Sequence, residues 1–189
     1  MKKYAVLSIT LVVLASLTFT GFQCGSAEST SAKLYMKNRD FEKAEAALLK
    51  DLEKDPNNAE SWYYLGSVRR EVGNHQGMID AFNSSLKISK EFETKINEEK
   101  KFIWGNSVKE GALAFNAAKN VSPDSAKLLT EKAIKAFKTA IIIDPDSAIP
   151  YQNLAIAYHA QGKIDEEITA LKQSLDRKKD PQFYGYLIN

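Results

Sequence analysis

The chain has 189 residues, of which 44% are hydrophobic, 10% aromatic and 26% charged, with a formal net charge of +2. This apolar content excludes a disordered tail, and a single cysteine excludes a small domain held together by disulfides. The charge is too small and too evenly spread to predict a nucleic-acid surface, so no nucleic-acid partner is expected. One globular domain or a short array of repeats remains.

The first 23 residues have the three-part pattern of an export signal. Lys2 and Lys3 give a basic start, and residues 4–22 carry no charge. Serine and threonine residues dilute this apolar run, whereas a permanent membrane anchor needs about 20 apolar residues. We therefore expect residues 1–23 to be a signal peptide and residues 24–189 to be the exported part.

Cys24, the only cysteine, follows the apolar run directly. The segment resembles the lipobox of bacterial lipoproteins, although Gly21 and Gln23 depart from the usual leucine and small residue. The resemblance implies lipidation of Cys24 and a lipid-anchored protein in the bacterial cell envelope, with its folded part in the periplasm or at the cell surface. The alternative is cleavage after Ala27, which discards the cysteine and leaves a soluble periplasmic or secreted protein.

From residue 24 onward the sequence repeats with a period of 34. Gly66 lies 34 residues after Ala32, and Leu171 lies 34 residues after Phe137. Apolar residues recur at spacings of three and four, as on the buried face of a helix; residues 62–72 place Trp62, Leu65 and Val72 on such a face. A period of this length predicts a stacked array of helix pairs.

The residues at these positions resemble the tetratricopeptide repeat. Its first helix is matched by Trp62, Leu65 and Gly66 and again by Tyr151, Leu154, Ala155 and Tyr158. Its second helix and closing proline are matched by Ala44, Leu48 and Pro56 and again by Ala133, Phe137, Ala140 and Pro145. Departures are Arg69 where tyrosine is usual, and Met78 and Glu167 where alanine is usual. The resemblance implies an all-α, right-handed solenoid of antiparallel helix pairs, with about four repeats at 25–58, 59–92, 93–147 and 148–180 and the start of a fifth at 181–189.

Local signals predict where the helices stop. The prolines of Asp55-Pro56 and Asp144-Pro145 cannot continue a helix. Gly73 and Gly162 lie where a helix ends in a left-handed turn.

The third repeat is irregular. If Gly111 is its small residue, about 11 extra residues precede it and 10 follow it. The first insertion, residues 89–101, mixes both charge signs, which is typical of a solvated helix face. We expect one long helix of about 25 residues from Phe92 to Lys119, followed by a helix that starts at Ser122-Pro123.

Tyr184 and Leu187 have the spacing of Tyr151 and Leu154, so a fifth repeat begins near the end of the sequence. It stops halfway through its first helix. We expect either that the sequence is truncated or that a short terminal helix covers the end of the array.

No nucleophile elbow, P-loop, dinucleotide-binding or zinc-protease motif occurs in the sequence. His75 and His159 lack a second histidine at metal-ligand spacing. We therefore predict no catalysis, no cofactor and no metal. The resemblance instead implies a scaffold that binds a protein or peptide partner in the concave groove of the solenoid. The alternative is a docking module of a longer exported enzyme or solute-binding protein whose functional domain lies beyond residue 189.

In the family, the groove is lined by solvent-side residues of the first helix of each repeat. The matching positions here are Tyr63, Ser67, Arg70, Gln152, Ile156 and His159. Tyr63 and Arg70 are suited to act as anchors, because tyrosine and arginine are enriched at binding hot spots.

Overall fold

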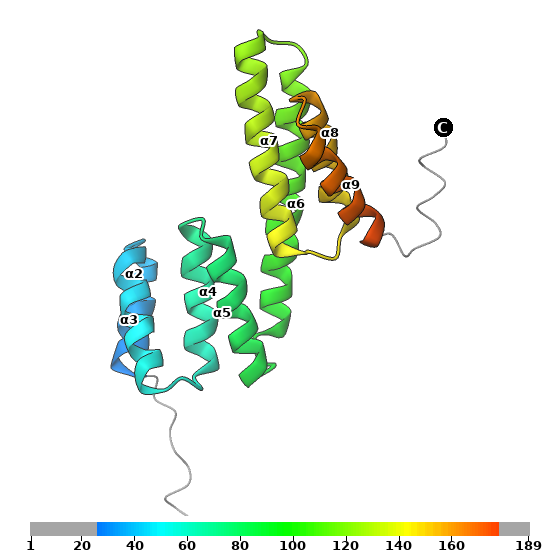
Figure 1. The fold of residues 1–189 in the computed structure, drawn as a ribbon. Helices are drawn as coiled ribbons and strands as arrows, with labels where there is room; N and C mark the ends of the chain where they lie inside the picture. Colours follow the sequence, from blue (N-terminus) through cyan, green and yellow to red (C-terminus); the bar gives the residue numbers. More distant parts are fainter. Residues whose placement is uncertain (1–25, 178–189) are drawn as a thin grey trace, which may run out of the picture.

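The computed structural model describes residues 26–177, which form eight helices joined by short turns. Consecutive helices pack as antiparallel pairs, and the pairs stack side by side (Figure 1). The described part contains no strand, so the predicted all-α solenoid is confirmed. Residues 1–23, Cys24 and the predicted fifth repeat at 181–189 lie outside the described residues. The helices are α2 (Ala27–Lys37), α3 (Phe41–Lys54), α4 (Ala59–Glu71), α5 (His75–Ile88), α6 (Glu93–Ala118), α7 (Pro123–Ile143), α8 (Ala148–Ala160) and α9 (Ile164–Arg177).

The helix ends follow the local signals in the sequence. Helix α3 ends at Lys54, just before Asp55-Pro56, and α7 ends just before Asp144-Pro145. Asn58 then caps α4, because its side chain accepts a hydrogen bond from the Ser61 N–H at 3.1 Å. These predicted stops are confirmed.

Left-handed residues close the turn inside three of the four pairs. Gly73 and Gly162 have φ angles of 73° and 70°, as predicted. Arg39 lies 34 residues before Gly73 and adopts the same conformation, with φ 59°. In these three turns a residue just after the first helix adopts the left-handed conformation, although only glycine does so without strain.

Small residues let the two helices of a pair approach closely. A Cβ atom on Gly66 would lie 2.3 Å from the ring of Phe82, and one on Gly111 would lie 2.4 Å from the ring of Phe137. Both phenylalanines are buried. Gly111 therefore does in the irregular third pair what Gly66 does in the second, which confirms the register inferred from the spacing.

The irregular pair has longer helices than the others. Helix α6 has 26 residues and α7 has 21, whereas α4 and α5 have 13 and 14. The N-terminal part of α6 runs beyond the end of α7 (Figure 1). There Ile96 and Ile103 join a core cluster with Met78 and Phe82 of α5. The long helix expected from Phe92 to Lys119 and the helix start at Ser122-Pro123 are confirmed.

One predicted core residue is wrong. Val72 is 53% exposed, whereas Leu65 and Val68 are fully buried. Helix α4 ends at Glu71, so Val72 follows the last helical turn and no longer continues the buried face.

A buried carboxylate joins the first two helix pairs. Asp51, in α3, is 2% exposed. It accepts hydrogen bonds from Ser61 Oγ at 2.5 Å and Asn58 Nδ2 at 2.9 Å, and a further one from Ser26 Oγ. Asp51 thereby connects the starts of α2 and α4 to the last turn of α3.

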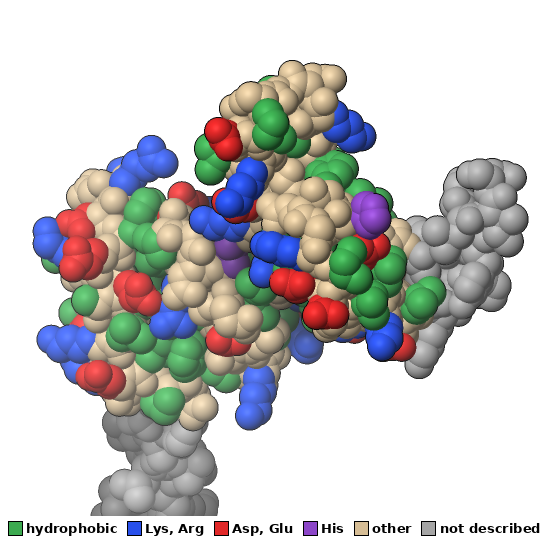
Figure 2. Space-filling view, turned by 45° about the horizontal axis from the view of Figure 1, so that its top comes forward, with side chains coloured by type: hydrophobic (Ala, Val, Ile, Leu, Met, Phe, Trp, Pro, Cys, Tyr) green, Lys and Arg blue, Asp and Glu red, His purple; other side chains and the backbone are tan. Residues whose placement is uncertain are grey.

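The last described helix exposes an apolar stripe. Leu171 is 44% exposed, although its repeat equivalents Leu48, Phe82 and Phe137 are buried. In the earlier pairs the next first helix covers this side, and no described helix follows α9. Hydrophobic side chains accordingly gather over the α8–α9 end in Figure 2, while charges of both signs are interspersed over the rest of the face shown. The stripe consists of Ile164, Ile168, Leu171 and Leu175.

Candidate functional site

The six residues predicted to line the groove lie on two first helices. Three of them, on α4, meet a single acid of α6. Glu99 Oε1 accepts a hydrogen bond from the Tyr63 hydroxyl at 3.0 Å and one from Ser67 Oγ at 3.4 Å. Arg70 Nη1 lies 3.3 Å from Glu99 Oε2, and the Glu99 side chain is only 16% exposed. The structure therefore brings Tyr63, Ser67 and Arg70 together through an intramolecular contact.

The ring of Tyr63 is also covered by the N-terminal part of α6. It stacks on Phe92 with ring centroids 4.7 Å apart and an interplanar angle of 11°. Burial, followed by the nearby Glu99 carboxylate, raises the pKa of Tyr63 to about 12. The predicted anchor on α4 is thus half-buried against its own chain.

Sequence reasoning missed Glu99, because it belongs to a run of mixed charges that was expected to be a solvated helix face. The neighbouring apolar residues gave the available signal. Phe92, Ile96 and Ile103 recur at helical spacing within and beside that run, and all three are buried. One side of the charged helix therefore had to face the preceding repeat.

Substituting Glu99 with glutamine should weaken this contact. We expect the pKa of Tyr63 to fall from about 12 but stay above 10, since burial, its largest cause, remains. The free energy of unfolding should fall by about 1–2 kcal/mol, because the Arg70 ion pair and two charge-assisted hydrogen bonds are lost. Spectrophotometric tyrosine titration and urea denaturation measure the two effects, and a Tyr63→Phe chain assigns the titration step. An unchanged Tyr63 titration would contradict the contact.

The other three predicted residues lie on α8 and point to different places. Ile156 is 53% exposed and lines a groove of about 250 Å³ between α6 and α8. His159 is exposed, and its Nδ1 lies 2.9 Å from Glu167 Oε2 of α9. Gln152 is half-buried, and its Nε2 has no hydrogen-bond partner among the described residues. Of the three, only Ile156 lies in that groove.

The groove around Ile156 combines apolar and amide side chains with one cation, Lys119. Phe115 and Asn116 line it from α6, and Asn153 lines it from α8. An apolar surface with nearby amides can hold a peptide, because asparagine both donates to and accepts from a main chain.

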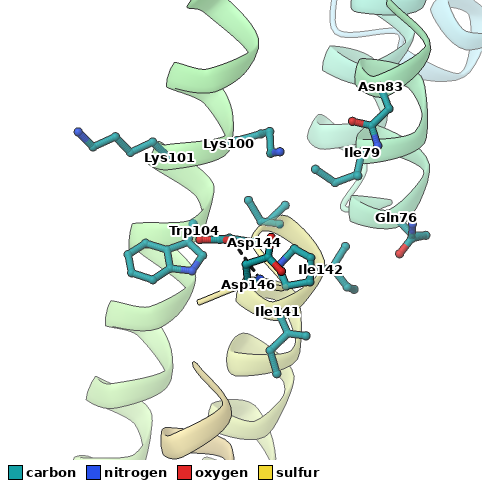
Figure 3. Close-up of a pocket in the computed structure, with 12 residues that line it drawn as sticks. Gln76, Ile79, Asn83, Lys100, Lys101, Trp104, Ile141, Ile142, Asp144 and Asp146 are labelled. Atoms are coloured by element: carbon teal, nitrogen blue, oxygen red, sulfur yellow. Dashed lines mark hydrogen bonds between the residues drawn. The ribbon is translucent and has the colours of Figure 1, made fainter. Parts of the chain in front are cut away.

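A larger cleft lies on another side of the molecule, between α5, α6 and the end of α7 (Figure 3). It has a volume of about 780 Å³. Ile79 of α5 and Ile141 and Ile142 of α7 supply apolar lining, and Trp104 of α6 stands beside them. No residue here was predicted as functional, because the cleft is lined by second helices and by the irregular α6, whereas the prediction considered the regular first helices α4 and α8.

Between residues 26 and 177 no three histidine, cysteine, aspartate or glutamate side chains are grouped as metal ligands. Within the same range, no helix has the length and apolarity required to cross a bilayer.

Three family models match the sequence. One described as tetratricopeptide repeat matches residues 30–91, one described as TPR repeat matches 130–162, and another tetratricopeptide-repeat model matches 148–181. These segments are therefore similar to tetratricopeptide repeats. Residues 92–129, which contain α6 and the start of α7, lie between the matched repeats. The irregularity is thus confined to the third repeat.

Three solved structures with similar repeats are those of MamA, of TTC0263 and of YrrB. TTC0263 is a thermophilic TPR protein of Thermus thermophilus. MamA is 23% identical, with 84% of this chain and 80% of that chain covered and a TM-score of 0.34. TTC0263 is 17% identical, with 82% of this chain and 77% of that chain covered and a TM-score of 0.41. YrrB, described as having an unusual peptide-binding site, is 18% identical, with coverage of 82% and 87% and a TM-score of 0.38. No curated protein sequence gave a significant match.

Stacked tetratricopeptide repeats expose long curved surfaces that bind segments of other proteins. Repeat families of this kind are typically non-catalytic interaction modules. The repeats therefore indicate a protein-interaction scaffold. Among the described residues, no side chain covers Ile156 in its groove.

Proposed function

We propose that the chain is an exported lipoprotein that holds a segment of a partner protein in the groove between α6 and α8, at a bacterial membrane surface. The observation that carries the binding proposal is that the exposed Ile156 lines this groove together with Phe115, Asn116 and Asn153. The export signal at residues 1–23 and the position of Cys24 support the lipoprotein part.

The groove differs from the predicted surface in extent. Tyr63 and Arg70 are engaged with α6, so the proposed contact surface is limited to α6 and α8. An apolar side chain of the partner would cover Phe115 and Ile156, and the partner's main chain would meet the two asparagines.

Ile156→Arg tests the groove. Peptides selected from a random dodecapeptide phage library on the full chain should lose about tenfold or more in affinity for the variant, because a charge replaces the apolar contact. Leu34→Arg is the control, since Leu34 is 58% exposed but lies on α2, away from the groove. Selected peptides that bind both variants equally well would count against the groove, and a library without any binder would sink the scaffold proposal.

Cys24→Ser tests the anchor. Cells that express the full chain should incorporate radioactive palmitate into it, and the substitution should abolish this labelling, because the thiol is the attachment atom. Ala27→Ser is a nearby control that leaves the cysteine in place. Labelling of the Cys24→Ser chain, or a mature protein that starts at Glu28, would rule out lipidation at Cys24.

A further inference from the structure

The cleft between α5, α6 and α7 lies outside the groove and owes its existence to the irregular repeat. Helix α6 has 26 residues where α4 and α8 have 13. The N-terminal part of α6 shares a core cluster with Met78 and Phe82 of α5 and with Ile143 in the last turn of α7, and the cleft opens beside that cluster. The resulting volume of about 780 Å³ is within the range of ligand-binding sites.

Charged side chains of opposite sign lie on opposite sides of the cleft. In Figure 3, Lys100 extends from α6 toward α5, whereas its neighbour Lys101 points away. Asp144 and Asp146 lie across the cleft, in the connection from α7 to α8. Among residues 26–177, none of these four charges forms a salt bridge, although opposite signs line the same cavity. A ligand with one charge of each sign could pair with both sides.

Uncharged polar groups at the same place also lack partners. The Trp104 indole nitrogen is closed off from solvent and has no hydrogen-bond acceptor among the described residues. A buried donor without an acceptor costs about 1–3 kcal/mol, so an acceptor brought by a ligand would be favourable. Asn83 of α5 lies exposed at the cleft and offers both a donor and an acceptor.

We propose that this cleft is a second binding site, which takes a short extended protein segment carrying an apolar side chain between an acidic and a basic one. The apolar side chain packs on Ile79, Ile141 and Trp104. The acidic group meets Lys100, the basic group meets Asp146, and Asn83 meets the main chain of the segment. The inference rests on the proposed scaffold function, but no residue that lines this cleft also lines the α6–α8 groove.

The test starts from a random dodecapeptide phage library selected on the full chain in detergent. Peptides that still bind Ile156→Arg should be enriched in an apolar residue flanked by opposite charges. Their synthetic forms should shift the Trp104 indole N–H signal in a ¹⁵N-correlated spectrum and leave the Trp62 signal in place. Trp104→Phe assigns the two signals.

Charge reversal tests the orientation. Lys100→Glu should weaken the selected peptide about tenfold, because an attractive pair becomes a repulsive one. Lys101→Glu, the adjacent lysine that points away, should change the affinity by less than about twofold. The double variant Lys100→Glu with Asp146→Lys should prefer a peptide whose acidic and basic residues are exchanged.

Three results would overturn the site. They are enriched peptides without the mixed-charge pattern, an unmoved Trp104 signal, and equal effects of Lys100→Glu and Lys101→Glu. If peptide binding depends on Ile156 alone, the proposed function stands and the second site falls. If no peptide is selected at all, both fall. Binding of a second copy of the chain in place of peptides, detected as a dimer that Lys100→Glu disrupts, would also overturn the proposal.

Discussion

Gly111→Ala is expected to lower the free energy of unfolding by about 1–3 kcal/mol, although alanine is the better helix former. The added Cβ would lie 2.4 Å from Cε1 of Phe137, and two more ring atoms would lie within 2.8 Å. Phe137 is 2% exposed, so its ring is packed on nearly all sides and cannot move without disturbing its neighbours. Either α6 and α7 separate, or the ring leaves its rotamer, and both reduce the packing of the irregular pair.

Gly105→Ala is the matched control on the same helix. No atom lies within 4 Å of a Cβ placed there, so the helix preference of alanine should raise the free energy of unfolding by about 0.5–1 kcal/mol. Urea denaturation followed by circular dichroism measures both variants. The two substitutions should therefore change the free energy of unfolding in opposite directions. A stabilised Gly111→Ala chain would show that the close packing against Phe137 is wrong.

Asp51→Ala is expected to lower the free energy of unfolding by about 2–4 kcal/mol. The substitution removes the acceptor for Ser26, Asn58 and Ser61, and it leaves the fully buried Ser61 hydroxyl without that partner. Because these groups start α2 and α4, the loss should fall on both helix starts at once.

Thermal and urea unfolding measure this effect, and amide hydrogen exchange locates it. Exchange should accelerate in the first turns of α2 and α4 before it does so in α7. Asp80→Ala is the control, because Asp80 is exposed and, among the described residues, its carboxylate accepts a hydrogen bond only from Gln76. It should change the free energy of unfolding by less than about 0.5 kcal/mol. An effect of Asp51→Ala no larger than that of the control would contradict the network.

The repeat spacing was sufficient to predict the helix pairs, because each position in the period has one packing role. The spacing put Gly111 at the small-residue position of the third repeat, and the structure packs it against Phe137. An insertion shifts the count but does not change what the position contacts. The length of α6 followed from the same count, because about 11 extra residues precede Gly111.

The contacts of the groove residues on α4 could not be predicted, because the repeat pattern describes a regular neighbour and α6 is irregular. Tyr63 and Arg70 hold the predicted positions on α4, but the additional turns of α6 bring Glu99 against them. Asp51 was missed for a different reason. Its partners Ser26 and Ser61 lie 25 and 10 residues away, and no periodic pattern connects them.

The cap at Ser26 has a consequence for how the array would stand at a membrane. Ser26 begins α2, and its hydroxyl is bonded to the buried Asp51. Under the lipoprotein proposal, only two peptide steps separate the acylated Cys24 from this fixed point, which is a reach of about 7 Å. Because this connecting segment is so short, the α2–α3 end would lie against the lipid headgroups. The groove and the cleft would then lie at set heights above the bilayer, and partners would have to approach along the membrane plane.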